Sequence, residues 1–400
     1  MKRALCLFLA VLLFSASFVL FPKETHAAPV TINVYNWGQY ISDGTDGYID
    51  VIAEFEKAYP DIRVNYMVYD SNETMYTKLQ SGGNSFDVIV PSDYMVDKLI
   101  AEDKLEPLDF SNIPNYQYLD DAYKNLAYDP ENKYSVPYTW GYVGIIYNTK
   151  YVNEEDVGSW DLLWNRNYAG KILMFDNPRD SFAIAEALLG YSLNTEDPEE
   201  LRAAAEKLKE QKNLVQSYVM DQIFDKLERE EAWIGAYYSG DYPLMVEENE
   251  DLAFNLPEEG FNIFVDALCI PKGCQHKKEA EIFINFLCEP RICGENLEYL
   301  DYATPFSAAK EFTSEELLED EVLYPDQEVL ERGEAFHALS TEATQLMNEL
   351  WLSVKTQEQD LAKYLILTIA ALVVSIGLYL FFHIRKKRLR GRRGSHYPSK

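Results

Sequence analysis

Short stretches in which apolar and polar residues alternate recur along the first part of the chain. Residues 30–35 and 62–69 show this period of two, which indicates half-buried strands. The nearly continuous apolar run FDVIV at 86–90 predicts a more fully buried strand. Between these strands, residues 51–59 place apolar side chains on one side of a helix, and residues 74–80 form a second, shorter helix. The order is therefore strand, helix, strand, helix, strand.

That order predicts a parallel sheet with helices packed on its faces. Sheets of this kind bind ligands beyond the carboxyl ends of their strands. The loops that follow the three strands are NWGQY, DSNET and PSDYM, which are all polar, and two of them carry aromatic residues. Trp37 places a large indole in the first of these loops. We therefore treat it as a candidate ligand contact.

A second series of strands and helices begins near residue 141. It comprises strands at 142–148, 171–175, 232–238 and 261–271 and helices at 198–211 and 341–360. The strand at 261–271 is long enough to cross between two lobes. The sequence thus predicts an α/β protein with one lobe made of residues 28–140 and 266–310 and a second made of residues 141–265 and 311–355.

Both ends of the chain carry apolar segments. Residues 1–27 have the basic start, apolar core and small-x-small cleavage site of a secretory signal peptide. Residues 364–382 contain no charge and are long enough to cross a bilayer as one helix. Because the strongly basic tail at 383–400 follows this segment, the positive-inside rule places the tail in the cytoplasm and the body of the protein outside the membrane.

The composition excludes some classes of function. A formal net charge of −30 argues against nucleic-acid binding, which needs a basic surface, and favours the attraction of cations. Histidine occurs at only five positions, and the sequence contains no Gly-x-Ser-x-Gly, no His-Glu-x-x-His and no phosphate-binding loop. We therefore expect neither enzymatic activity nor a cofactor.

The predicted strand ends are instead rich in aromatic rings and carboxylates. Ring faces attract ammonium groups, and a desolvated carboxylate forms a charge-assisted hydrogen bond with an amine. A flexible molecule with amines at both ends would satisfy such a site. Adjacent Tyr237 and Tyr238 raise an alternative, because paired tyrosinates can hold ferric iron together with other hard ligands. No histidine lies near them in the sequence, which weakens this alternative.

Four cysteines form two C-x4-C pairs, at 269 and 274 and at 288 and 293. In an exported body they could form two disulfides, for which three connectivities exist. A zinc site is the functional alternative, although the usual C-x2-C spacing is absent. Free buried thiols are the third possibility, and the sequence does not choose among the three.

Several longer motifs occur in a characteristic order. They are YNWGQYI, YDSNETMYTKLQSG, FDVIVPSDYMVDKL, YSVPYTWG, SWDLLW, DNPRDSF, IPKG with INFL, DYATPF and LYPD. With these motifs the chain resembles the spermidine/putrescine-binding proteins of bacterial polyamine importers. The resemblance extends over residues 30–350 and does not include the segment at 364–382. It implies a two-lobed, periplasmic-binding-protein-like fold of type II, in which a polyamine is clamped between the lobes.

The resemblance also implies the ligand-binding residues. They are Trp37, Tyr40, Ser92, Tyr94, Asn177, Asp180, Tyr238, Asp241, Phe264, Asp266 and Tyr302. Asp266 would be a central carboxylate for an amine, and Asp180 would hold one end of the ligand. Three positions depart from spermidine-preferring relatives, because Asn177 replaces an Asp and Tyr238 and Phe264 replace tryptophans. The position near Phe336 and His337 has no clear match to the family.

The resemblance implies a polyamine receptor of an ATP-driven importer, with two permease subunits and a cytoplasmic ATPase as partners. The C-terminal segment would attach this receptor to the membrane and keep it close to the permease. A membrane-anchored polyamine sensor is the alternative from a different class. The short tail after the span is too small for a signalling domain, so a sensor would need a separate partner.

Overall fold

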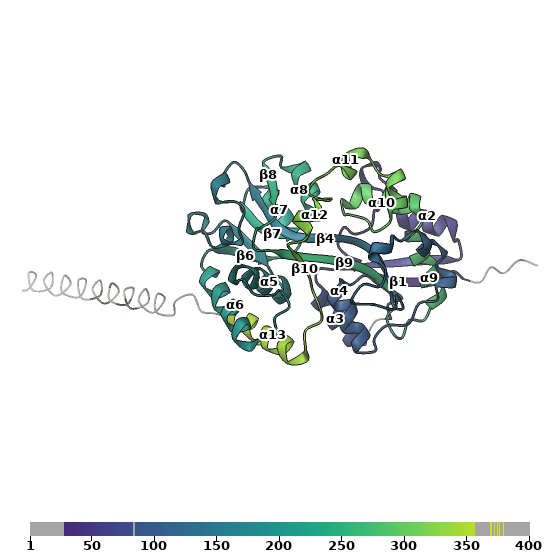
Figure 1. Cartoon of the computed structure of the whole chain (residues 1–400), viewed down its shortest axis with the longest axis horizontal. Coiled ribbons are helices and arrows are strands. Elements are labelled where there is room, and N and C mark those ends of the chain that lie inside the picture. The colour runs from purple at the N-terminus through teal and green to yellow at the C-terminus, as the bar shows by residue number, and fades with distance from the viewer. Residues whose placement is uncertain are drawn as a thin grey trace, which may run out of the picture.

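The computed structural model describes residues 28–82 and 85–356 and five single residues further on, Ile369, Leu372, Val374, Ile376 and Tyr379. One continuous path of strands runs through both halves of the molecule in the order β2-β1-β3-β9-β4-β7-β5-β6, with β10 beside β9 and β8 beside β4 (Figure 1). The strands are β1 (Val30–Trp37), β2 (Ile62–Tyr69), β3 (Val88–Ile89), β4 (Ser135–Asn148), β5 (Ile172–Phe175), β6 (Val215–Val219), β7 (Ile234–Tyr238), β8 (Leu252–Asn255), β9 (Phe261–Cys269) and β10 (Gly333–Ala335).

The strands on either side of the molecule form two parallel groups. β1 pairs in parallel with β2 and β3, and β5 pairs in parallel with β6 and β7, as the alternation of strands and helices predicts. The α-helices of the described residues are α2 (Val51–Ala58), α3 (Asn72–Gln80), α4 (Asp93–Ala101), α5 (Pro178–Leu189), α6 (Pro198–Gln211), α7 (Ile223–Glu228), α8 (Tyr242–Glu248), α9 (Lys277–Leu287), α10 (Pro290–Leu300), α11 (Glu315–Leu318), α12 (Gln327–Leu330) and α13 (Thr341–Thr356).

Two long antiparallel strands, β4 and β9, join the two groups and lie side by side across the middle of the molecule (Figure 1). β9 corresponds to the crossing strand that the sequence predicts. β4 begins at Ser135, well before the predicted strand at 142–148. Pro137 cannot donate to the ladder, and the register shifts between Pro137 and Thr139, so the start of this strand lacks a regular pattern.

Helix caps explain where several helices begin. The side chain of Ser71 accepts from the backbone N–H of Thr74, so α3 starts slightly earlier than the predicted helix at 74–80. Asp197 caps α6, whose first residue is Pro198, and this helix has the predicted bounds. Asn177 caps α5 by accepting from the N–H of Asp180. This cap orients the first turn of α5 toward the centre of the molecule.

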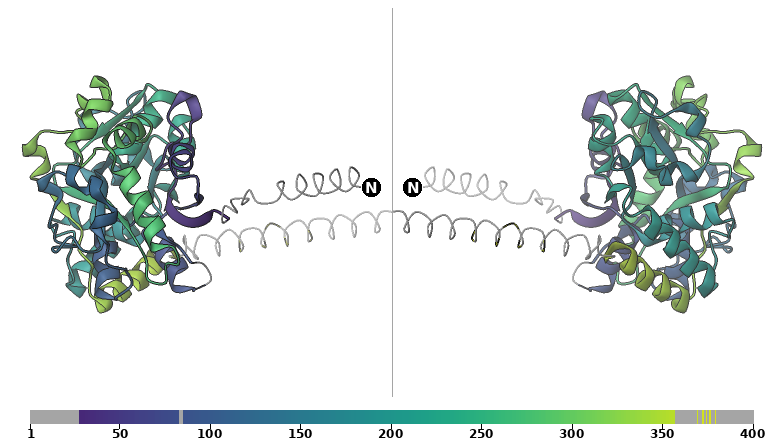
Figure 2. Two further views of the ribbon diagram at one scale, coloured as in Figure 1. Left: turned by 90° about the vertical axis from the view of Figure 1, so that its right-hand side faces the viewer. Right: turned by 90° about the vertical axis from the view of Figure 1, so that its left-hand side faces the viewer.

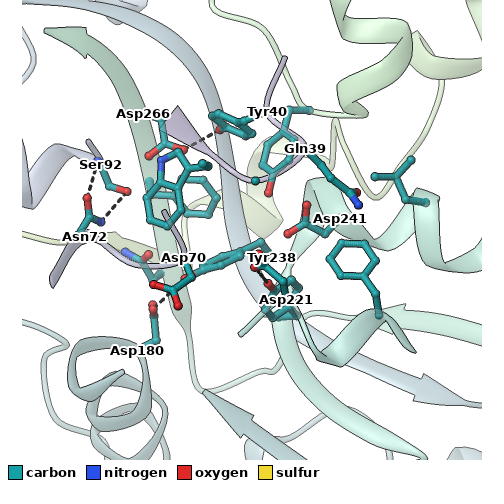
Figure 3. A pocket seen from close by; sticks show the side chains of 18 of the residues that line it. Gln39, Tyr40, Asp70, Asn72, Ser92, Asp180, Asp221, Tyr238, Asp241 and Asp266 are labelled. Carbon is teal, nitrogen blue, oxygen red and sulfur yellow. Dashed lines mark hydrogen bonds between the residues drawn. The ribbon is translucent and has the colours of Figure 1, made fainter. Parts of the chain in front are cut away.

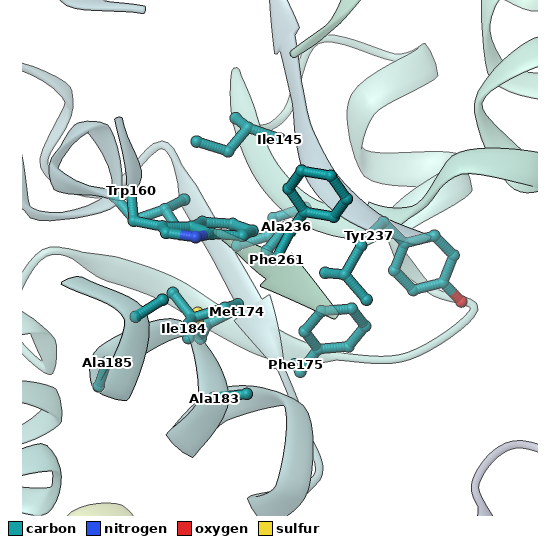
Figure 4. Packing of buried hydrophobic residues seen from close by; sticks show 14 of the residues in the cluster. Ile145, Trp160, Met174, Phe175, Ala183, Ile184, Ala185, Ala236, Tyr237 and Phe261 are labelled. Atoms are coloured by element: carbon teal, nitrogen blue, oxygen red, sulfur yellow. The ribbon is translucent and has the colours of Figure 1, made fainter. Parts of the chain in front are cut away.

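Buried side chains form a large cluster in each half, and we name the halves by these clusters. The first lobe contains β1–β3, α2–α4, α9 and α10. Its larger cluster includes Phe55 and Phe283, and a smaller one around α3 and α4 includes Met75 and Leu99. The second lobe contains β5–β8, α5–α8 and α13, and its cluster includes Trp160, Phe175 and Ile184 (Figure 4). The structure therefore has the two-lobed α/β architecture that the sequence predicts.

The last described helix, α13, packs on α5 and α6 and lies along the edge of the second lobe (Figures 1 and 2). Among the residues that the structure describes, none of the helices combines the length and apolar character that a bilayer span requires. The predicted span at 364–382 lies outside the described residues apart from five single positions, as do the predicted signal peptide at 1–27 and the tail at 383–400.

The two C-x4-C pairs are free thiols in the structure. Cys269, Cys288 and Cys293 are buried, and Cys274 contacts the Asp87 carboxylate at 3.1 Å. The described residues contain no group of three or more potential metal ligands.

Candidate ligand-binding site

A cavity of about 500 Å³ lies between the two lobes (Figure 3). Loops after six parallel strands contribute to it, three from each lobe, so both sheets present their carboxyl ends to the same space. Ten of the eleven predicted site residues line this cavity, and Asn177 is the exception. They are Trp37, Tyr40, Ser92, Tyr94, Asp180, Tyr238, Asp241, Phe264, Asp266 and Tyr302.

The cavity has aromatic walls that are packed against one another. The ring centroids of Tyr40 and Tyr302 lie 5.0 Å apart, edge to face, and those of Tyr238 and Phe264 lie 5.5 Å apart in the same arrangement. The indole N–H of Trp37 donates to the carbonyl of Val90 at 2.8 Å, which holds the ring at the strand edge. Rings positioned in this way present fixed faces to the space between the lobes.

Asp266 on β9 is a buried carboxylate that lines the cavity. The phenol of Tyr40 donates to its Oδ2 at 2.6 Å, and the Ser92 side chain also hydrogen-bonds to this carboxylate, although Oδ1 has no partner of regular geometry among the described residues. Burial raises the pKa of Asp266 to about 6. A carboxylate oxygen of this kind is costly to leave unpaired, so the site favours a ligand that donates a hydrogen bond.

Asp180 lies at one end of the cavity, in the first turn of α5. Its Oδ2 accepts from the Tyr238 phenol at 3.0 Å and from the Asn177 amide at 2.7 Å. Asn177 is buried behind Asp180 and does not line the cavity, so the prediction of a direct ligand contact is not met by the geometry. Its amide is occupied in capping α5 and in holding the Asp180 carboxylate.

Asp241 and Asp221 lie at another part of the cavity, on the side of the second lobe (Figure 3). Burial and the nearby charge of Asp221 raise the pKa of Asp241 to about 8. Asp221 accepts a hydrogen bond from Tyr237 at 3.2 Å, and burial raises its pKa as well. The ring of Tyr302 packs directly on Gly240, because a Cβ at that position would lie 2.3 Å from the ring.

The first lobe supplies polar groups that orient one another. Ser92 accepts from the Asn72 side-chain amide at 3.0 Å, and the Ser92 N–H donates to the same side chain at 3.2 Å. Tyr94 donates to Glu73 at 3.0 Å. These contacts hold Ser92 and Tyr94 against the cavity without filling it.

Sequence reasoning missed several lining residues. Asp70 and Asn72 belong to the DSNET loop, which the strand pattern already marks as a ligand loop. Asp221 follows β6, a strand that the sequence pattern does not predict, so no signal pointed to it. Phe336 also lines the cavity, although its position has no clear match to the family motifs.

The charge of the lining is one-sided. Ten of its residues are carboxylates, and none is lysine, arginine or histidine. The carboxylates are Asp46, Asp70, Asp180, Asp221, Asp225, Glu228, Asp241, Glu247, Glu248 and Asp266. A cavity with these groups and aromatic walls is built for a cation that also has apolar surface.

The geometry does not favour ferric iron. Tyr237 and Tyr238 point their phenols to separate carboxylates, Asp221 and Asp180. Burial and these carboxylates raise the pKa of both phenols well above the usual value.

Comparisons with known proteins agree with this site. Residues 50–323 match the model of a family described as bacterial extracellular solute-binding protein. The chain is 35% identical over 305 residues to the spermidine/putrescine-binding periplasmic protein of Escherichia coli K12, covering 76% of this chain and 86% of that protein. It is 31% identical over 346 residues to the putrescine-binding periplasmic protein SpuD of Pseudomonas aeruginosa, covering 81% and 92%.

Two solved structures are also similar. One is a protein from Listeria monocytogenes assigned to a spermidine/putrescine ABC transporter, with a TM-score of 0.77 and 38% identity over 82% of this chain and 99% of that chain. The other is the spermidine/putrescine ABC transporter substrate-binding protein PotD of Streptococcus pneumoniae, with a TM-score of 0.68 and 36% identity over 82% and 98%.

Proposed function

Since the chain belongs to the bacterial extracellular solute-binding proteins, we propose that it is the extracytoplasmic polyamine receptor of an ATP-driven importer. The relatives are named as polyamine-binding periplasmic proteins, and the similar structure from Streptococcus pneumoniae is named as the substrate-binding protein of an ABC transporter. The ligand would be a polyamine such as putrescine or spermidine, held between the two lobes.

The observation that carries this proposal is the charge of the cavity. Ten carboxylates and no basic residue line a space whose walls are aromatic. A polyamine matches both features, because its ammonium groups pair with carboxylates and its methylene segments lie against the rings. An anionic or neutral ligand would leave the buried carboxylates of Asp180 and Asp266 without a compensating charge.

In the proposed complex, different carboxylates of the cavity bind different amines of the ligand. Asp266, which Ser92 also approaches, would accept a hydrogen bond from a central or terminal amine through Oδ1. Asp180 would hold one end of the ligand, and Asp241 with Asp221 would hold an amine on another side of the cavity. Asn177 would act on the ligand only through Asp180, since it lies behind that carboxylate.

The lobes would close on the ligand by a hinge in the strands that join them. We propose that the first lobe consists of residues 28–140 and 266–323 and the second of residues 141–265 and 341–355. The boundary at 310 in the sequence prediction moves to 323 because Leu317 and Leu323 pack in the cluster of the first lobe. Residues 324–340 would then connect the two lobes.

We also propose that the segment at 364–382 anchors the receptor in the membrane. Four residues of this segment, Ile369, Leu372, Val374 and Ile376, have helical backbone conformation. These four apolar residues are 51–61% exposed, and lipid would cover such an apolar surface. The anchor would keep the receptor next to two permease subunits and, through them, a cytoplasmic ATPase. The binding body would lie outside the cytoplasm and the basic tail inside.

The experiment that tests the function is calorimetric titration of the full exported chain in detergent. Putrescine, cadaverine, spermidine and spermine are titrated in turn, with ferric citrate as the control for the iron alternative. Saturable one-to-one binding of a polyamine at micromolar concentration or below is the expected result. Heat with ferric citrate and none with any polyamine would contradict the proposal.

A pull-down from membranes separates an importer from a sensor. We expect permease subunits and an ATPase to be recovered with the receptor. Recovery of a kinase or a signalling receptor, without permease subunits, would favour the sensor.

A further inference from the structure

Arg179 is a buried cation directly behind a cavity for cations. It lies in the first turn of α5 between Pro178 and Asp180, is only 5% exposed, and does not line the cavity. Its Nη1 donates to the carbonyl of Leu193 at 2.6 Å, and its Nη2 donates to Asn194 Oδ1 at 2.7 Å. These acceptors draw the guanidinium away from the ligand space.

The same guanidinium contacts the connection between the lobes at residues 333–338. Its centre lies 3.9 Å from the ring centroid of Phe336, and Nη2 donates to the carbonyl of His337 at 3.4 Å. Asn194 extends this contact, because it accepts from the N–H of His337 at 2.8 Å and donates to the carbonyl of Ala335 at 2.9 Å. Strand pairing of β10 with β9 and hydrogen bonds of Glu334 hold residues 333–335 in the second lobe, and Arg179 and Asn194 extend this attachment to Phe336 and His337.

The connection also touches the first lobe. The ring of Tyr94 lies edge to face against Phe336 at a centroid distance of 5.8 Å. The centroid of the Tyr94 ring lies 5.9 Å from the centre of the Arg179 guanidinium. The N–H of Ala338 donates to Asp97 at 3.1 Å. Tyr94 and Phe336 both line the cavity, so the contact between the lobes is part of its wall.

We propose that Arg179 is a positioning residue for ligand capture, an inference that rests on the proposed polyamine-binding function. The guanidinium fixes residues 333–338 so that Phe336 faces the cavity and Tyr94 of the first lobe can close against it. Arg179 therefore acts on the closed arrangement of the lobes and not on the ligand itself.

Arginine suits this role better than lysine. Its planar group can stack on a ring and donate several hydrogen bonds in one plane at the same time, whereas an ammonium is a strongly hydrated point charge. In the structure the guanidinium uses its edge for two carbonyls and one amide oxygen and its face for Phe336. Lysine could replace the charge but not this combination of contacts.

The test compares Arg179→Met, Arg179→Lys, Phe336→Leu and the double variant Arg179→Met/Phe336→Leu in the full chain. Arg166→Met, at an exposed arginine elsewhere in the second lobe, is the matched control. We expect each Arg179 variant to weaken putrescine and spermidine binding by the same factor, on the order of tenfold, with faster ligand release. Hydrogen exchange at residues 333–338 of the ligand-free protein should increase in the same variants.

The double variant distinguishes a positioning role from a general loss of stability. If Arg179 acts through Phe336, the double variant should bind the polyamine with the same affinity as whichever of Arg179→Met and Phe336→Leu has the lower affinity. Independent, additive effects would overturn the proposal, as would unchanged affinity or a changed spermidine-to-putrescine ratio. Should Arg179→Met fail to fold, Asn194→Ala must give the same uniform loss, and wild-type affinity in that variant would refute the proposal.

The two proposals can fail separately. If the unmodified protein binds no polyamine, the proposed function is wrong, and faster exchange at residues 333–338 in Arg179→Met still supports the positioning role. Unchanged exchange in that variant would overturn it.

Discussion

The phenol of Tyr40 donates a 2.6 Å hydrogen bond to Oδ2 of Asp266, whereas Oδ1 of the same carboxylate is buried with no regular hydrogen-bond partner among the described residues. The two residues lie far apart in the sequence, in the first loop of the chain and in the crossing strand β9. Their contact occupies one oxygen of a buried carboxylate that Ser92 also approaches, and the other oxygen can accept from a ligand donor. An ammonium group is the donor that also neutralises its charge.

Replacement of this carboxylate should therefore impair binding strongly. We expect Asp266→Asn to weaken polyamine binding by about 2–5 kcal/mol, because a buried ammonium loses its charged partner. Calorimetric titration measures the change, with Asp61→Asn as the control, since Asp61 is exposed and outside the cavity. Wild-type affinity in Asp266→Asn would exclude Asp266 from the site.

Binding should strengthen as pH rises. The pKa of Asp266 is about 6 and that of Asp241 about 8 in the empty cavity, and in both cases burial is the main cause. An ammonium favours the ionised carboxylate, so binding releases protons, and affinity increases between about pH 5 and 8. Each carboxylate contributes at most about tenfold per pH unit below its pKa.

Titrations in buffers of different ionisation enthalpy measure this proton release directly. The amines of the ligand stay protonated throughout this range, because their pKa values resemble that of lysine. Asp241→Asn should remove the upper part of the pH dependence. An affinity that stays constant from pH 5 to pH 8 would contradict the prediction.

Asn177 offers a test of ligand preference. Asn177→Asp keeps a side chain that can cap α5, but it replaces the amide 2.7 Å from Asp180 with a second carboxylate. We expect the ratio of spermidine to putrescine affinity to rise several-fold, because two adjacent buried carboxylates share a proton in the empty site and the ligand with more amines better compensates the second charge. Asn177→Ser, a neutral capping residue, is the control. An unchanged ratio would show that this loop does not set preference.

The acidic lining should accelerate ligand association at low salt. Raising ionic strength from 10 mM to 150 mM should lower the association rate of spermidine by about an order of magnitude, because salt screens the attraction of the cavity for a cation. The double variant Asp225→Asn/Glu228→Gln should reduce that salt dependence without a comparable change in release rate. Stopped-flow measurements test both statements, and a salt-independent rate would refute the first.

A pH dependence of stability is expected from Glu186, whose charge interacts with that of Arg179. It is fully buried on α5, its two carboxylate oxygens have no hydrogen-bond partner among the described residues, and burial raises its pKa from 4.5 to about 8. Between these two values the folded protein holds a proton that the unfolded chain has lost. The free energy of unfolding should therefore fall as pH rises, by at most about 1.4 kcal/mol per unit.

Glu186→Gln should remove this slope. Denaturant unfolding of both proteins at pH 5 and pH 8 measures it, and the variant should gain stability relative to the wild type at the higher pH. Equal slopes in the two proteins would show that Glu186 does not titrate between these values.

The sequence alone determined which segments form several of the strands and helices. Apolar residues alternate with polar ones in β1 and β2 and recur at helical spacing in α6, because one face of each element is buried. This pattern can be recognised within each segment without knowledge of the rest of the fold. Motifs at the strand ends were also readable, because ligand loops follow parallel strands. The eleven site residues came from the family resemblance that these motifs carry, and ten of them line the cavity, although they come from distant parts of the chain.

Only the tertiary structure decided which of these groups face the ligand space. Asn177 and Asp180 are three residues apart in one motif, but the first turn of α5 places Asp180 at the cavity and Asn177 behind it. Asp221 and Phe336 reach the cavity through the packing of the second lobe and through the connection at 333–338, which have no short-range signature. Side-chain direction depends on how elements pack together, and that information lies in contacts between residues far apart in the chain.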